Sequence, residues 1–144
     1  MDDLEQLIWE TRRLFQALSV AADEALKPLN INGSDRALIE FLIRETEPIS
    51  LAALARKRSV SRQHIHQSLG RLRNPRWIEQ KPAPDDARSI LLSITPEGRA
   101  LWKEIRSIDR TILRKISKRV QPSAARAAAE TLRHIRQVVL EKKS

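Results

Sequence analysis

The stretch SVSRQHIHQSLGRLR, residues 59–73, decides how this chain folds. Within it Ile65, Leu69 and Leu72 recur at i, i+4 and i+7, which is the spacing of one buried stripe on an α-helix. Ser61 precedes the stripe and is a suitable N-cap. We therefore predict a helix that starts after Ser61 and packs its apolar face inward.

The opposite face of this helix is polar and carries no acid. It holds Gln63, Gln67, Gly70 and Asn74. A glutamine amide can pair with an adenine edge, and an arginine fork fits guanine, in the major groove of DNA. Gly70 would let the groove wall come close. The face is therefore predicted to read base pairs.

The two histidines of the stretch, His64 and His66, raise the alternative of a metal or acid/base site. Residues two apart on a helix point roughly 200° from each other, so this pair cannot hold one ion from an intact helix. The third histidine, His134, has no carboxylate arrangement around it in the sequence that suggests catalysis. We expect no metal, no cofactor and no catalytic site.

The charge distribution favours a nucleic-acid partner. The formal net charge is +9 over 144 residues. Between Pro48 and Ile78 there are seven lysines and arginines and no aspartate or glutamate. A solvated basic face is the ordinary alternative, but such faces normally mix charges of both signs. A run of positive charge this long suits phosphate backbones.

The remaining composition limits the fold and the cellular setting. Aromatic residues make up only 3%, so a core of Leu, Ile, Val and Ala is expected, which favours helices. There is no cysteine, which excludes disulfides and thiolate metal sites. The N-terminus MDDLEQLIWE lacks the pattern of a secretory signal, and no apolar run approaches the ~20 residues of a membrane span. A cytoplasmic protein is expected.

Around the opening stretch, apolar spacing and turn residues predict the other elements. Helices are expected at 3–27, after Ser34 as an N-cap, and after Ser50, the last forming a helix-turn-helix with the opening stretch. WIEQK and SILLSI, separated by PAPDDAR, indicate a β-hairpin. Thr95-Pro96-Glu97 starts a long helix to about Val120, and a last helix follows Gln121-Pro122. The predicted class is mainly α with a small two-stranded β wing.

The hairpin turn contains Asp86 and Arg88. Arg88 is placed to enter a minor groove, where negative potential attracts arginine. Two roles for Asp86 stay open: it either pairs with Arg88 and directs it, or simply favours the turn.

The element order and three segments resemble the MarR family of winged helix-turn-helix transcriptional regulators. The segments are LARKRSVSRQHIHQSLGRL, WIEQ and DDARSILLSITPEGRAL. The most specific match is Asp-x-Arg, an alternating apolar strand and Thr-x-x-Gly. Here these residues are Asp86, Arg88, Leu92, Ile94, Thr95 and Gly98.

The resemblance implies a single domain, 1–144, with a winged helix-turn-helix lobe at 30–95 and dimerisation helices at 3–27 and 96–142. It implies a homodimer that binds a pseudo-palindromic operator in double-stranded DNA, acts as a repressor and is released by a small aromatic or phenolic acid. Two positions depart from the family pattern. Asn74-Pro75-Arg76 occupies a turn that usually contains glycine, and Arg58 stands where an apolar residue is usual.

Carried onto this sequence, the resemblance and the residue chemistry together give four groups of candidate site residues. The recognition-helix group is Ser61, Arg62, Gln63, His64, His66, Gln67, Arg71 and Arg73. The wing group is Asp86 and Arg88, and the DNA-backbone group is Arg56, Lys57, Arg58 and Arg76. The effector-pocket group is Trp9, Arg12, Arg13, Arg36 and Trp102.

Three other classes of function compete with a sequence-specific regulator. A nonspecific architectural DNA-binding protein also needs charge and a winged motif, but little base discrimination. A protein-interaction adaptor would use the winged domain to bind another protein. An enzyme fits worst, because the sequence shows no metal cluster, glycine-rich phosphate loop or nucleophile constellation.

Overall fold

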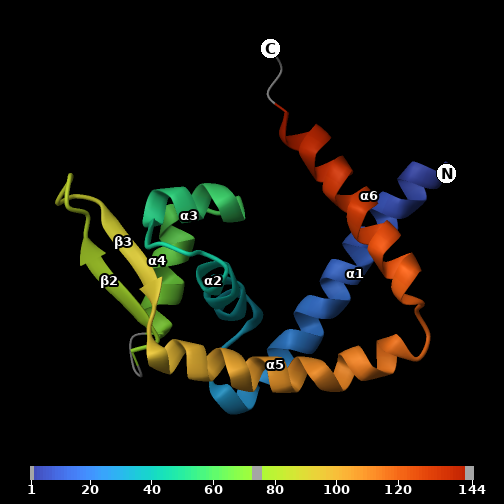
Figure 1. Cartoon of the computed structure of the whole chain (residues 1–144), viewed down its shortest axis with the longest axis horizontal. Coiled ribbons are helices and arrows are strands. Elements are labelled where there is room, and N and C mark those ends of the chain that lie inside the picture. The colour runs from blue at the N-terminus through green and yellow to red at the C-terminus, as the bar shows by residue number, and fades with distance from the viewer. Residues whose placement is uncertain (1, 73–75, 142–144) are drawn as a thin grey trace. The chain divides into compact units, whose positions relative to one another are not determined.

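The structure is a computed structural model and describes residues 2–72 and 76–141 (Figure 1). Contacts between residues divide the chain into two compact units, Met1–Arg106 and Ser107–Ser144. Each unit is described by itself below.

The elements follow the predicted order. The helices are α1 (Asp3–Leu26), the short 3-10 helix η1 (Lys27–Leu29), α2 (Gly33–Ile43), α3 (Leu51–Arg58), α4 (Arg62–Arg71), α5 (Pro96–Ser117) and α6 (Pro122–Leu140). The strands are β1 (Ile49–Ser50), β2 (Ile78–Pro82) and β3 (Ile90–Ile94). Helix α5 begins in the first unit and ends in the second. None of the described helices is long and apolar enough to cross a bilayer.

The first unit contains a three-stranded antiparallel sheet, in the order β1-β3-β2. Ile78 of β2 lies opposite Ile94 of β3, and Ile49 of β1 lies opposite Leu92. The hairpin of β2 and β3 confirms the predicted wing. Strand β1 adds a third strand that the sequence did not predict, because it has two residues and is too short to give an alternating pattern.

Side-chain caps fix where the two helices of the helix-turn-helix begin. Ser50 accepts from the Ala53 N–H at 3.1 Å at the start of α3, and Ser61 accepts from the His64 N–H at 3.0 Å at the start of α4. The predicted cap at Ser61 and the predicted start of a helix at Ser50 are both confirmed. The turn between the two helices passes through Ser59, whose φ of 53° is left-handed.

The expected N-cap of α2, Ser34, was wrong, because Asn32 takes that role. The Asn32 side chain accepts from the Asp35 N–H at 2.9 Å, and the Asp35 carboxylate accepts from the Asn32 N–H at 3.1 Å. This reciprocal capping box satisfies two backbone donors and starts the helix at Gly33.

The core of the first unit is aliphatic, as the composition predicted. The stripe Ile65, Leu69 and Leu72 is buried. It shares the core with other leucines and isoleucines from nearly every element. These include Leu26, Leu38, Ile39, Leu42, Leu51, Leu54, Leu92, Leu101 and Ile105. Helix α4 is therefore held by its apolar side, with its opposite side turned outward.

The start of α5 is held against the wing by Thr95. Its hydroxyl accepts from the Gly98 N–H at 3.0 Å and can donate to the carbonyl oxygen of Arg76 or Trp77, each 2.9 Å away. Thr95 thus caps α5, as predicted, and joins it to the first residues of the hairpin.

Candidate nucleic-acid interface

The outward face of α4 carries the residues expected to read bases. Arg62, Gln63, His66 and Gln67 are exposed, and so is Gly70. A methyl group added at Gly70 would meet no atom within 4 Å. The fold therefore leaves this polar face free to approach a partner. Arg73, also expected in this group, lies outside the described residues.

Two residues of the expected recognition group instead contact α2. His64 is partly buried, and its Nε2 lies 2.6 Å from the Ser34 hydroxyl. Arg71 donates from Nη2 to Asp35 Oδ1 at 2.9 Å and from Nε to the same oxygen at 3.1 Å. Sequence reasoning missed both partners. The side chain of Ser61 is likewise engaged, as the cap of α4.

The basic residues around α4 differ in how exposed they are. Arg56, Lys57 and Arg76 are exposed, as contacts to a phosphate backbone require. Lys57 Nζ lies 2.5 Å from Glu45 Oε1. One of the four residues expected to contact the DNA backbone therefore already forms an ion pair within the protein. Glu45 lies three residues before the acid-free stretch that begins at Pro48, so the charge pattern of that stretch gave no sign of this ion pair.

Arg58 lies inward. Its Nη2 donates to the Ser34 carbonyl at 3.5 Å, and its guanidinium lies 5.9 Å from the centre of the Phe41 ring. Burial lowers the pKa of Arg58 below its ordinary value, while attraction to Asp35 raises it. Its Nη1 is buried and has no hydrogen-bond partner within the described part of the chain. A phosphate contact by Arg58 would require it to leave these neighbours.

The wing turn is shaped by Asp86. Its Oδ1 accepts from the backbone N–H of Arg88 at 2.9 Å, and its Oδ2 lies 3.4 Å from the Ser89 hydroxyl. The turn is closed by the Ala83 N–H, which donates to the Ser89 carbonyl at 2.9 Å. Asp86 thus makes the turn-forming contacts and holds the main chain of Arg88, whose side chain is exposed.

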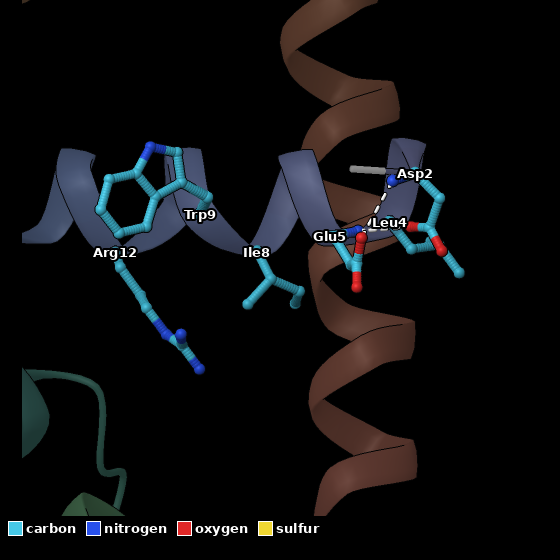
Figure 2. Close-up of a pocket in the computed structure, with 6 residues that line it drawn as sticks. All are labelled: Asp2, Leu4, Glu5, Ile8, Trp9 and Arg12. Atoms are coloured by element: carbon cyan, nitrogen blue, oxygen red, sulfur yellow. Dashed lines mark hydrogen bonds between the residues drawn. The ribbon is translucent and has the colours of Figure 1, made fainter.

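The five expected effector residues form two separate clusters. Trp9 and Arg12 line a shallow depression along α1, with Asp2, Leu4, Glu5 and Ile8. Figure 2 shows Ile8 and Arg12 extending to the same side of that helix. Arg13 lies 5.8 Å from the centre of the Trp9 ring. Arg36 lies 5.5 Å from the centre of the Trp102 ring and pairs with Glu40 at 2.8 Å.

No group of three or more His, Asp or Glu side chains suited to a metal ion occurs among residues 2–72 and 76–141. At α4 the structure presents an exposed polar helix face, and the β2–β3 hairpin lies beside this helix (Figure 1). Such a surface can bind a grooved, negatively charged partner.

The chain was compared with family models, with curated proteins and with solved structures. Residues 31–98 match the family model described as a winged helix DNA-binding domain. No curated protein matches the chain.

Several solved structures share the fold over nearly the whole length. MarR from E. coli in its apo form is 22% identical, with 98% of each chain covered and a TM-score of 0.71. A MarR transcriptional regulator from Methanosarcina mazei Go1 is 15% identical, with 94% of this chain and 97% of that chain covered and a TM-score of 0.83.

A MarR family regulator from Streptomyces coelicolor, solved in complex with DNA, is 18% identical. All of this chain (100%) and 93% of that chain are covered, with a TM-score of 0.81. The TM-scores and coverages of these structures establish a common fold, and at that level they confirm the resemblance predicted from the sequence. Residues 31–98 are thus similar to a winged helix DNA-binding domain, and the chain as a whole has the fold of solved MarR family transcriptional regulators.

Proposed function

We propose that this protein is a sequence-specific DNA-binding transcriptional regulator. The observation that carries the proposal is the orientation of α4: its Ile65 and Leu69 side is buried, and its Gln63 and Gln67 side is exposed. A helix of this kind fits the major groove, where glutamine and arginine discriminate base edges. Arg88 on the wing would enter the adjacent minor groove.

The proposed binding unit is a homodimer on a pseudo-palindromic operator, with one α4 in each half-site. Large apolar side chains are exposed on the terminal helices, at 3–27 and 96–142, which are the helices expected from the sequence to form the dimer. On α1 they include Leu14, Phe15 and Leu18. On the last turns of α5 they include Ile112 and Ile116. A second copy would remove these surfaces from water.

The proposal includes a cytoplasmic location and repression that is relieved by a small aromatic or phenolic acid. Two contacts support such an effector: an arginine lies near the ring of Trp9 and another near the ring of Trp102. An arginine beside an aromatic ring can hold a carboxylate while the ring contacts the aromatic part of the ligand.

The function is tested by selecting bound sites from random duplexes and then titrating salt against the selected and a scrambled duplex. A specific regulator keeps an affinity ratio of about 10³ or more at physiological salt. A ratio near one would identify a nonspecific architectural protein. Failure to bind any duplex at low salt would favour a protein-interaction adaptor.

Lys57 should contribute to binding without contributing to discrimination. We expect Lys57→Ala to weaken selected and scrambled duplexes by the same factor, and to lower the slope of log affinity against log salt by about 1. Its matched variant is Glu45→Gln, which releases Lys57 from its ion pair and should strengthen binding to both duplexes. Fluorescence anisotropy over a salt series measures both. Unchanged affinity in both variants would remove Lys57 from the interface.

Gly70 should be the residue at which stability and binding change in opposite directions. Because a methyl group at this helical position meets nothing, Gly70→Ala is expected to stabilise the fold by about 0.5–1 kcal/mol. The same methyl group would stand between α4 and the groove wall, so operator binding should weaken. Urea unfolding and operator titration measure the two effects. Undiminished operator binding would show that this turn of α4 does not approach DNA.

A further inference from the structure

We propose that the first turn of α2 positions the recognition helix, with Asp35 setting the orientation of α4 through Arg71 and Ser34 supporting it through His64. Arg71 and His64 then act inside the protein and are not base contacts. The inference rests on the proposed function and names residues that determine its specificity.

The central contact joins a buried acid to a half-exposed cation. The Asp35 side chain is 1% exposed and the Arg71 side chain 47% exposed. Two guanidinium nitrogens of Arg71 reach Asp35, and its Nη2 also lies 3.4 Å from the hydroxyl of Ser68, a buried residue of α4. A buried carboxylate with a forked partner has a strongly preferred geometry. The last turn of α4 is therefore tied to α2.

The carboxylate that holds Arg71 is itself fixed. Asp35 Oδ2 accepts from the Asn32 N–H as part of the capping box of α2. The same side chain thus starts α2 and receives Arg71. Because its position is set by the backbone of α2, Asp35 can act as a rigid anchor for a neighbouring helix.

A second contact holds the first turn of α4. The Ser34 hydroxyl lies 2.6 Å from His64 Nε2. His64 and Arg71 are seven residues apart, close to two helical turns, so they lie on the same side of α4. Arg58 of α3 donates to the carbonyl of the same Ser34. Two contacts two turns apart resist both rotation of α4 about its axis and tilting away from α2.

Orientation matters more for base reading than for phosphate contact. Side-chain atoms lie about 5–6 Å from a helix axis, so a rotation of about 10° moves them by about 1 Å. A shift of that size is enough to break well-aligned hydrogen bonds to base edges. Long lysine and arginine side chains can follow a phosphate over the same distance. Loss of the α2 contacts should therefore reduce specificity more than general affinity.

The test is a double-substitution cycle on the selected and scrambled duplexes with Asp35→Asn, Arg71→Gln and the pair together. Each single variant is expected to lower the ratio of selected to scrambled affinity by about tenfold, and the pair by no more than either alone. Circular dichroism first establishes that each variant is folded, because an unfolded chain with a net charge of +9 would bind both duplexes through phosphate contacts and lower the ratio. Ser34→Ala should lower the ratio in the same direction by a smaller factor, and it remains a test if the Asp35 variant does not fold.

The matched control is Glu40→Gln, which breaks the ion pairs that Glu40 forms along α2 with Arg36 and Arg44. In the interactions described, Glu40 makes no contact with α4. It should leave the ratio unchanged. The inference is overturned if Asp35→Asn keeps the ratio of selected to scrambled affinity of the unsubstituted protein. It is also overturned if Arg71→Gln lowers that ratio as much in the Asp35→Asn background as it does alone, and Arg71 would then be a direct DNA contact. If the unsubstituted protein itself shows a ratio near one, the proposed function fails instead.

Discussion

Replacing Gly98 by alanine is expected to lower the free energy of unfolding by about 3 kcal/mol, the upper end of the range for overpacking a core. A Cβ at this position would lie 2.3 Å from the carbonyl oxygen of Trp77 and 2.7 Å from Cδ1 of Ile94. The carbonyl cannot readily move aside, because it accepts the Thr95 N–H at 3.0 Å. Urea unfolding followed by circular dichroism measures the loss.

The sign of this effect makes the prediction sharp. Inside an exposed helix, alanine is favoured over glycine by about 1 kcal/mol, so a position without close neighbours would be stabilised. Gly70→Ala is the matched control, with the opposite expected sign. If Gly98→Ala were as stable as the unsubstituted protein, α5 would not be packed against the wing as described.

Gly98 also gives the Thr-x-x-Gly pattern a physical meaning. Thr95 caps the helix by accepting the Gly98 N–H, and the missing side chain of Gly98 lets α5 begin directly against Trp77 and Ile94. The motif therefore fixes how α5 leaves the wing. The motif belongs to the fold and not to the proposed DNA-contacting surface.

Local signals in the sequence were sufficient to predict most elements. The i, i+4, i+7 spacing identified the buried side of α4, and Ser50 and Ser61 marked the starts of α3 and α4. The N-cap of α2 was misplaced, although Asn32-x-x-Asp35 is itself a capping signal. Strand β1 had no local signal, since its two residues pair only with β3, more than forty positions later in the sequence.

The candidate site was less predictable on its flanks than on its outward face. Periodicity identifies the buried stripe, and therefore the face opposite it, but it cannot tell which flank meets another helix. Arg62 and Arg71 are the same residue type and both lie on the flanks of α4. Arg62 is nevertheless exposed, whereas Arg71 contacts Asp35, thirty-six residues earlier in the sequence. Such a partner is set by tertiary packing, so only the structure reveals it.

Replacing Gln63 or Gln67 by alanine is expected to weaken binding to the selected duplex by about 1–3 kcal/mol each and to leave scrambled DNA nearly unaffected. Both side chains are exposed, so stability should change by no more than about 0.5 kcal/mol. Gln80→Ala, at an exposed glutamine of β2 that lies outside the candidate site groups and outside the proposed dimerisation helices, is the matched control and should change neither affinity. Anisotropy titrations of the two duplexes at one salt concentration measure the effect.

The spacing of the two glutamines adds a second, independent expectation. They are one helical turn apart, with Cβ atoms about 5–6 Å from each other, which corresponds to between one and two base-pair steps of about 3.4 Å. They should therefore read different base pairs, and the double variant should lose more affinity for the selected duplex than either single variant. In site selection each single variant should relax one position in both half-sites. Equal losses on selected and scrambled duplexes would mean that the glutamines supply general affinity and that α4 reads sequence by other residues.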